Sequence, residues 1–251
     1  MAGAAGVRRE AKRMRGEARA RRGERARRAE TLREGRERPS RPRAVDADGA
    51  FRADDLIESL SADGVAVRDR FLSASQLEAL NECATARRER GDFAQARIGA
   101  GRALQRRADI RGDSICWLEE PLFPAERELF ALFEKARLSL NQGLFLGLYD
   151  LEQHYACYPA GSGYARHVDQ PRSHGARRLS SIVYLNENWQ TADGGALRCL
   201  DDRGDFREIE PVGGRLVLFL TEGREHEVLR TSRERLSITG WFLGREAHAL
   251  R

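Results

Sequence analysis

A change in hydrophobic pattern near Leu144 constrains the fold more than any other feature of the sequence. Before this residue, apolar side chains recur at the three- and four-residue spacing that is typical of amphipathic helices. Beyond it, they alternate with polar residues in short runs separated by turn residues, which is typical of half-buried strands. Short strands that follow a group of helices favour an α+β fold, mainly β, in which a double-stranded β-helix (jelly roll) core is supported by N-terminal helices.

The same pattern predicts the individual elements. Three helices and one short strand are expected in the first part, at Ala53–Ser61, Val65–Val67 (the strand), Ser73–Arg88 and about Pro124 to Asn141. Ser73 and Gln76 have the spacing of a capping box, and Pro124 suits the first turn of a helix. Eight strands are expected beyond Leu144, at Leu148–Cys157, Ala165–Val168, Leu179–Asn186, Ala196–Leu200, Phe206–Ile209, Arg215–Leu220, Glu225–Leu229 and Glu234–Leu243.

The first 48 residues are expected to form a separate, basic and disordered arm. Residues 1–43 hold sixteen Lys or Arg and six Glu, a net charge of +10, so the rest of the chain sums to −5. A segment of this composition without aromatic residues buries too little apolar surface to offset the entropy of ordering. The positive charge of this arm suits binding to an anionic partner such as RNA or a ribosome. A solvated tail without a partner is an equal alternative, because no aromatic side chain is present to stack on bases.

Residues 49–247 are expected to form one folded domain, with helical support at about 49–143 and the jelly-roll core at about 144–247. No apolar run approaches the roughly 20 residues of a membrane span, and no hydrophobic signal core follows the basic N-terminus. The sequence therefore predicts a cytoplasmic protein without membrane association. The cysteines have neither CxxC nor zinc-ligand spacing and are expected to be buried, reduced thiols: Cys83, Cys116, Cys157 and Cys199.

His167, Asp169 and His226 form a candidate metal site. In an extended segment residues i and i+2 point to the same side, so His167 and Asp169 can bind one ion together. His226 follows Asp169 by 57 residues and can supply a third ligand from a distant strand. Two histidines and one carboxylate leave coordination positions open, as in non-haem iron(II) oxygenases. An HxD pair alone is a weak signal, and the surrounding sequence must decide its meaning.

Arg235 strengthens this interpretation, because it lies on a strand that alternates in polarity. Period two places Arg235, Ser237, Thr239 and Trp241 on one face, and Leu236, Ile238 and Phe242 on the other. An arginine on the inner face of a core strand is unfavourable unless an anion meets it. Its planar guanidinium suits the carboxylate of a dicarboxylic keto acid whose other end chelates the metal. The alternative is a structural ion pair with an internal acid.

Six segments carry a family resemblance in addition to these single residues. They occur in order between about residues 100 and 245, with few gaps: Tyr158–Asp169, Ser181–Asn186, Gly194–Arg198, Ile209–Pro211, His226–Val228 and Arg235–Trp241. Together they resemble the catalytic core of prolyl hydroxylases, specifically the hypoxia-inducible-factor prolyl hydroxylases of animals and their bacterial relatives.

The resemblance implies a dioxygenase that uses iron(II), 2-oxoglutarate and O2, with ascorbate as a support of its activity. It implies hydroxylation of a prolyl residue in a protein, with succinate and carbon dioxide as co-products. Tyr184 would join Arg235 on the far carboxylate of 2-oxoglutarate, with Thr239 nearby. Tyr158 would lie near the iron-chelating end of the co-substrate. Leu197 and Trp241 would line the pocket, although an ordinary core position is the alternative for the aromatic residues.

The segment Ile110–Trp117 resembles the part of this family that leads into a mobile loop over the substrate's proline. The resemblance implies that Arg111 and Asp113 position that loop, with Arg177 as an ion-pair partner for Asp113. Tyr164 and Arg166 would face the peptide. Without the resemblance, these charges are ordinary solvated loop residues.

The bacterial relatives suggest elongation factor Tu as the substrate protein. Alternatives are a ribosomal protein, another type of side chain or a free amino acid, and the basic arm gives some weight to a substrate among phosphates. A non-catalytic jelly-roll binding protein is disfavoured because all three metal ligands and Arg235 are present, although a fold alone does not prove chemistry.

Overall fold

The structure is a computed structural model, and it describes residues 53–96, 107, 110–169 and 177–244. Every described residue belongs to one compact unit, which lies within residues 43–251. The predicted basic arm lies outside the described residues.

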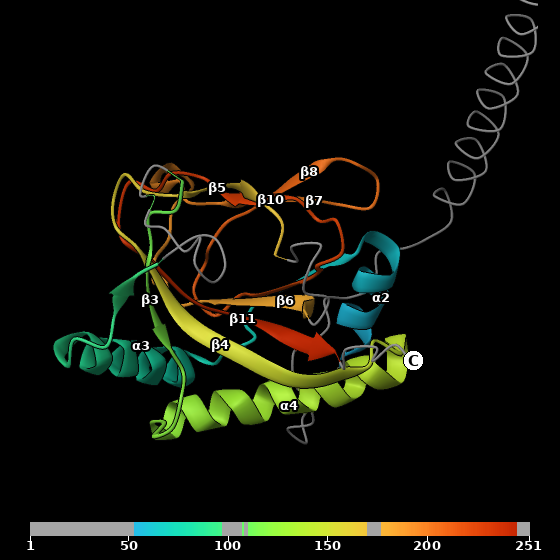
Figure 1. The fold of residues 1–251 in the computed structure, drawn as a ribbon, viewed down its shortest axis with the longest axis horizontal. Coiled ribbons are helices and arrows are strands. Elements are labelled where there is room, and N and C mark those ends of the chain that lie inside the picture. Colours follow the sequence, from blue (N-terminus) through green and yellow to red (C-terminus); the bar gives the residue numbers. More distant parts are fainter. Residues whose placement is uncertain (1–52, 97–106, 108–109, 170–176, 245–251) are drawn as a thin grey trace, which may run out of the picture. The chain divides into compact units, whose positions relative to one another are not determined.

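Two antiparallel sheets face each other across the centre of this unit (Figure 1). The larger sheet has the strand order β1-β9-β6-β11-β4-β3-β2, and the smaller sheet has the order β5-β10-β7-β8. The strands of the larger sheet are β1 (Val65–Arg68), β2 (Ala94–Gln95), β3 (Ser114–Trp117), β4 (Leu148–Tyr158), β6 (Arg177–Tyr184), β9 (Leu216–Leu220) and β11 (Arg235–Gly244). Those of the smaller sheet are β5 (Tyr164–His167), β7 (Leu197–Leu200), β8 (Phe206–Ile209) and β10 (His226–Val228). This arrangement confirms the predicted jelly roll.

The strands expected beyond Leu144 are all present, with ends that differ by a few residues. β2 and β3 were not expected. They are two and four residues long, too short to show a periodic pattern, and they extend the larger sheet beyond β4. Together with β1, they show that the segment before residue 144 contributes strands as well as helices.

In the described part of the chain, three α-helices accompany the sheets: α2 (Asp54–Asp63), α3 (Ala74–Glu89) and α4 (Pro124–Leu144). The capping box before α3 is confirmed, because Ser73 Oγ accepts from the backbone N–H of Gln76 at 3.2 Å, and Gln76 Oε1 accepts from that of Ser73 at 3.0 Å. Pro124 begins α4, as the sequence predicts. Among the described residues, no helix is both long and apolar enough to cross a membrane.

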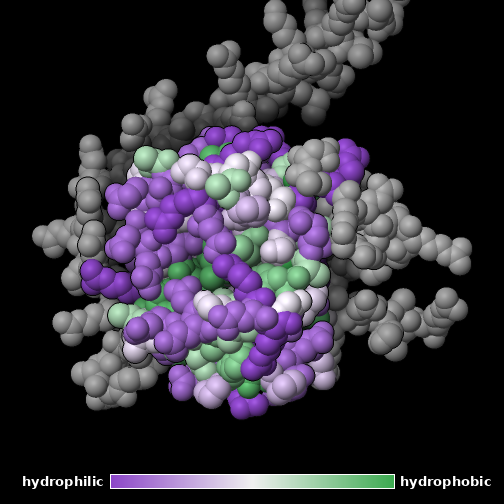
Figure 2. All heavy atoms as spheres, turned by 90° about the vertical axis from the view of Figure 1, so that its left-hand side faces the viewer, coloured by the Kyte–Doolittle hydropathy of each residue, from purple (hydrophilic) through white to green (hydrophobic). Residues whose placement is uncertain are grey.

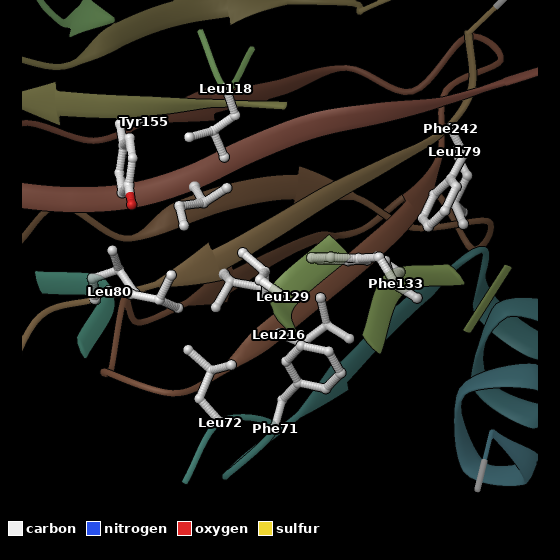
Figure 3. Packing of buried hydrophobic residues seen from close by; sticks show 14 of the residues in the cluster. Phe71, Leu72, Leu80, Leu118, Leu129, Phe133, Tyr155, Leu179, Leu216 and Phe242 are labelled. Atoms are coloured by element: carbon white, nitrogen blue, oxygen red, sulfur yellow. The ribbon is translucent and has the colours of Figure 1, made fainter. Parts of the chain in front are cut away.

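The main hydrophobic core lies between α3, α4 and the outer face of the larger sheet (Figures 1 and 3). Leu129 and Phe133 of α4 are at most 1% exposed and pack with Leu216 and Phe242 from the sheet. A second cluster fills the space between the sheets and includes Val217. All four cysteines are buried and free, in agreement with the expectation from their spacing.

β11 belongs to both the core and the space between the sheets. It pairs with β4 on one side and with β6 on the other. Leu236, Ile238 and Phe242 join the core under the helices, whereas Arg235, Thr239 and Trp241 line a cavity on the opposite face. The predicted alternation along this strand is therefore present.

A buried ion pair connects the two long helices. Glu126 of α4 is fully buried and accepts two hydrogen bonds of 2.7 Å from the guanidinium of Arg87 on α3. The hydroxyl of Tyr155 on β4 donates to the same carboxylate at 3.1 Å, and the backbone N–H of Phe123 donates at 2.9 Å. The network therefore joins α3, α4 and the larger sheet, with the buried charge fully hydrogen-bonded.

Glu126→Ala is expected to lower the free energy of unfolding by about 3–5 kcal/mol, because it leaves the Arg87 guanidinium buried without its main anion. Chemical denaturation followed by circular dichroism measures the change. Glu128 is exposed on the same helix, and Glu128→Ala is expected to change this free energy by less than about 0.5 kcal/mol. Equal losses in the two variants would contradict a structural role for the pair.

Candidate active site

A cavity of about 620 Å³ lies between the two sheets. Inward-facing residues of β3, β4, β6 and β11 line it on one side, and residues of β5, β7 and β10 line it on the other. Figure 2 shows hydrophobic residues at the centre of one face of the molecule, surrounded by hydrophilic ones. All three expected metal ligands and Arg235 line this cavity.

β5 and β10 bring the candidate metal ligands together. His167 ends β5 and lies opposite His226, the first residue of the antiparallel strand β10. Oδ1 of Asp169 lies 3.7 Å from Nε2 of His167 and 3.5 Å from Nε2 of His226. One ligand atom from each residue lies within 4.8 Å of the other two. Because each bond from such a ligand to a metal is about 2.0–2.2 Å long, the three atoms suit one common ion.

The electrostatics of this triad favour a cation. Burial works to raise the pKa of Asp169, but the charge of His226 and hydrogen bonds from both histidines outweigh it and hold this pKa well below its ordinary value. Burial lowers the pKa of His167. For His226, burial also works to lower the pKa, but the charge of Asp169 raises it overall. Asp169 is therefore an ionised carboxylate held close to two imidazoles.

A hydrogen bond orients each ligand from the side opposite the candidate metal position. The bonds join Ser180 Oγ to Asp169 Oδ2 (2.6 Å), His167 Nδ1 to the carbonyl of Ala165 (2.8 Å) and His226 Nδ1 to the carbonyl of Arg224 (3.2 Å). The bonds at Nδ1 leave Nε2 of each histidine available to a metal. Such outer partners fix the orientation and the tautomer of metal ligands.

Arg235 is a buried cation with an incomplete set of partners. It is 1% exposed, and its Nε donates to the carbonyl of Gly195 at 2.9 Å. Its guanidinium lies 5.1 Å from the ring centre of Tyr158 and 5.0 Å from that of Tyr184, and its Nη2 has no hydrogen-bond partner. Within the described part of the chain, no carboxylate lies within 4.0 Å of it. The alternative of an internal ion pair thus finds no support among these residues.

The other residues expected around the co-substrate lie close to Arg235. Tyr184 is fully buried, and its hydroxyl has no hydrogen-bond partner. Burial raises the pKa of this phenol, so the hydroxyl is a neutral donor. Tyr158, Leu197, Thr239 and Trp241 all line the cavity. Their roles toward 2-oxoglutarate stay predictions, but their positions suit those roles.

The predicted ion pair between Asp113 and Arg177 is wrong. Asp113 is fully buried and pairs with Arg111, which donates to it at 2.7 and 3.0 Å. Arg177 instead pairs with Glu152 at 2.8 Å and lies 3.5 Å above the ring centre of Trp241. The two-residue separation of Arg111 and Asp113 gives the acid a nearer partner than the sequence resemblance suggested.

Tyr164 and Arg166, expected to face a peptide, lie in different surroundings. Tyr164 lines the cavity beside His167. The side chain of Arg166 is 49% exposed, lies over the ring of Phe206 at 4.5 Å and approaches Glu225 and Glu227 to within 4 Å. Arg166 is thus available to a partner at the surface.

Sequence reasoning missed two residues of the site, Ser180 and His154. Ser180 occupies an inward position on β6, but a serine in a strand carries no signal of its own. His154 lines the cavity between the rings of Trp117 and Trp241, at centroid distances of 4.8 and 5.5 Å. Period two along β4 places His154 on the same face as Tyr158, and this signal would have found it.

His154 gives the stability of the protein a defined pH dependence. Burial, together with the charges of Arg111 and Arg177, lowers its pKa from 6.5 to about 3. Below about pH 6.5 the imidazole is protonated in the unfolded chain, whereas in the folded chain it stays neutral down to about pH 3. The free energy of unfolding therefore falls as the pH falls through this window. In His154→Gln, the slope of the unfolding free energy against pH is expected to be shallower by up to about 1.4 kcal/mol per pH unit. Denaturant titrations from pH 4 to 8 measure it, and an unchanged slope would contradict the burial of a neutral imidazole.

Ser180→Ala is expected to weaken metal binding by about tenfold, because Asp169 loses the hydrogen bond that orients its carboxylate. Calorimetric titration with manganese(II) measures the dissociation constant. Ser180→Thr keeps the hydroxyl and is the matched control. Equal affinity in Ser180→Ala and the wild type would show that the hydrogen bond is dispensable.

The chain is similar to known proteins in sequence and in fold. The 2OG-Fe(II) oxygenase superfamily matches residues 153–243. Prolyl hydroxylase EGLN3 of Homo sapiens is 32% identical over 206 residues, which cover 77% of this chain and 84% of that protein. Egl nine homolog 1 of Homo sapiens is 30% identical over 202 residues, which cover 77% of this chain and 47% of that protein.

Two solved structures are similar to the described fold. A prolyl-4-hydroxylase from Pseudomonas putida is 40% identical, with a TM-score of 0.68, and the match covers 76% of this chain and 97% of that one. A prolyl hydroxylase from Trichoplax adhaerens, in complex with a peptide fragment of the hypoxia-inducible-factor oxygen degradation domain, is 27% identical with a TM-score of 0.70. That match covers 76% of this chain and 88% of the other.

Proposed function

Because this chain belongs to the prolyl hydroxylases of the 2OG-Fe(II) oxygenase superfamily, we propose that it hydroxylates a proline in a loop of elongation factor Tu. The protein is a 2-oxoglutarate-dependent peptidyl-proline hydroxylase that uses iron(II), 2-oxoglutarate and O2. The identity of its substrate is the proposed part. A protein substrate with a target proline agrees with the relative from Trichoplax adhaerens, which was solved with a peptide.

His167, Asp169 and His226 are the proposed ligands of iron(II). Their donor set of two imidazoles and one ionised carboxylate suits this metal and leaves positions open for other ligands. Bound iron(II) supplies the oxygen chemistry that couples conversion of 2-oxoglutarate to succinate and carbon dioxide with hydroxylation of proline. The protein holds the ligands in position and keeps bulk water from the reacting groups.

Arg235 is the proposed anchor of 2-oxoglutarate, and its unpaired, buried Nη2 is the observation that carries the proposal. A carboxylate placed there would satisfy a guanidinium that has no anion among the described residues. The unpartnered hydroxyl of Tyr184 can donate to the same group, with Thr239 nearby. Two buried donors without partners would then be satisfied together.

Tyr158, Leu197 and Trp241 are proposed to shape the rest of the co-substrate pocket. Tyr158 is 5% exposed and lines the cavity beside Arg235, and its ring is proposed to shield 2-oxoglutarate from water. Leu197 on β7 and Trp241 on β11 approach from opposite sheets. Tyr164 and the exposed Arg166 are proposed to face the protein substrate.

Arg235→Lys is expected to raise the KM for 2-oxoglutarate by about 10- to 100-fold, because a bidentate hydrogen bond to a charged group contributes about 1.5–3 kcal/mol. Steady-state release of carbon dioxide at varied 2-oxoglutarate measures it. Arg233 is exposed two residues away, and Arg233→Gln is the control with an expected KM close to that of the wild type. An unchanged KM in Arg235→Lys would remove Arg235 from the co-substrate site.

Incubation of the protein with iron(II), 2-oxoglutarate and elongation factor Tu is expected to add one oxygen atom to a proline, as read by peptide mass spectrometry. The His226→Ala variant, which lacks a proposed ligand, is expected to leave the peptide unmodified. If prolines in other proteins of a cell extract are hydroxylated while elongation factor Tu stays unmodified, elongation factor Tu is not the substrate. The assignment as a prolyl hydroxylase would still hold. Modification of residues other than proline would contradict the assigned reaction.

A further inference from the structure

We propose that Arg111 and Asp113 are positioning residues for His167 and act on it through the ring of Tyr164. The inference rests on the proposed function in one respect, the role of His167 as a metal ligand. It assigns to this pair a task other than positioning the mobile loop over the substrate's proline, which the sequence resemblance implied. Three successive contacts connect the imidazole of His167 to the buried carboxylate of Asp113.

The first contact is the stack of Tyr164 on His167. The two rings lie 3.6 Å apart between centroids, with an angle of 18° between their planes. The hydrogen bond that His167 Nδ1 donates to the carbonyl of Ala165 fixes one point of the imidazole. A face-to-face ring in addition restricts rotation of the imidazole about its Cβ–Cγ bond, so the direction of Nε2 depends on where the phenol ring lies.

The second contact places Arg111 on the ring of Tyr164, with 4.9 Å between the guanidinium carbon and the ring centre. A guanidinium at this distance from an aromatic face is attracted by it, more strongly when both groups are shielded from water. The Arg111 side chain is only 16% exposed. The ring of Tyr164 therefore contacts both the guanidinium of Arg111 and the imidazole of His167.

The third contact holds Arg111 in place. Asp113 is fully buried and receives two hydrogen bonds from Arg111, from Nε at 2.7 Å and from Nη2 at 3.0 Å. Asp113 lines the cavity, but its side chain has no exposed surface. Its geometry fixes the plane of the guanidinium, because a bidentate pair allows little rotation.

The backbone reinforces the same alignment. Arg111 and Tyr164 form an antiparallel bridge, which is flanked by hydrogen bonds from Gly112 N to Gly163 O (3.0 Å) and from Ala165 N to Ile110 O (2.8 Å). Gly112 packs so closely that an added Cβ would lie 2.6 Å from the side chain of Ser162. The segment around Arg111 thus lies along the edge of β5, the strand that ends in His167.

His167 is the ligand that most needs such support. Its side chain is 20% exposed, compared with 6% for His226 and 9% for Asp169. His226 lies against Phe219, with 4.8 Å between ring centres, whereas His167 has the stack with Tyr164 as its corresponding support outside the triad. Loss of that stack is therefore expected to weaken metal binding more than it weakens peptide binding.

Calorimetric titration of the full chain with manganese(II) alone, without 2-oxoglutarate or peptide, tests the proposal. Tyr164→Leu and Asp113→Asn are expected to raise the dissociation constant by about tenfold or more, the size of effect seen when outer partners of a ligand are lost. Tyr164→Phe keeps the ring and is expected to bind like the wild type. Tyr149→Leu makes the same change at an exposed tyrosine of β4, 61% exposed, and is the control for the substitution.

The outcomes separate the two levels of the proposal. Asp169→Ala is expected to abolish manganese binding, and wild-type affinity in this variant would show that the proposed metal site itself is wrong. If Asp169→Ala abolishes binding while Tyr164→Leu binds like the wild type, the positioning role is overturned. Thermal melting shows whether Asp113→Asn is folded; if it is not, Arg111→Gln, which removes the guanidinium over the ring of Tyr164, takes its place. Wild-type affinity in a folded variant of either residue overturns the role of the pair.

Discussion

The pairing of β11 with β4 on one side and β6 on the other is the interaction on which both the core and the cavity depend. Its ladder places Thr239 beside His154 on β4 and Ile182 on β6, so three neighbouring strands line one cavity wall. The opposite face of the same strand packs against α4 through Phe133 and Phe242, with 5.9 Å between ring centres. The position of Arg235 is therefore fixed by the same strand that packs against α4.

Two buried arginines show how the protein distinguishes a structural charge from a binding charge. Arg87 meets Glu126 in a bidentate pair that is completed by Tyr155, so its charge is neutralised within the core. Arg235 is at least as deeply buried, yet its Nη2 has no partner. Since an unpaired buried cation is strongly unfavourable and no described carboxylate meets Arg235, this arrangement supports the proposed role of Arg235 in binding the carboxylate of 2-oxoglutarate.

Much of the fold followed from local patterns, because period two and capping residues act over a few neighbours. The ends of α3 and the two faces of β11 were predicted on this basis. Some of the features that were missed depend on long-range pairing. β3 joins the sheet through β4, and Ser180 acts on a carboxylate 11 residues away. Spacing along one chain does not encode such contacts.

The alternation of β11 also limits how this chain can change in length. A single inserted or deleted residue within Arg235–Gly244 would exchange the two faces of the strand beyond that point, turning apolar side chains into the cavity and polar ones toward the helices. The turns that flank the strands impose no such condition. Among homologues of this protein, differences in length are therefore expected in turns such as Asp201–Gly204, while the number of residues in β11 stays constant.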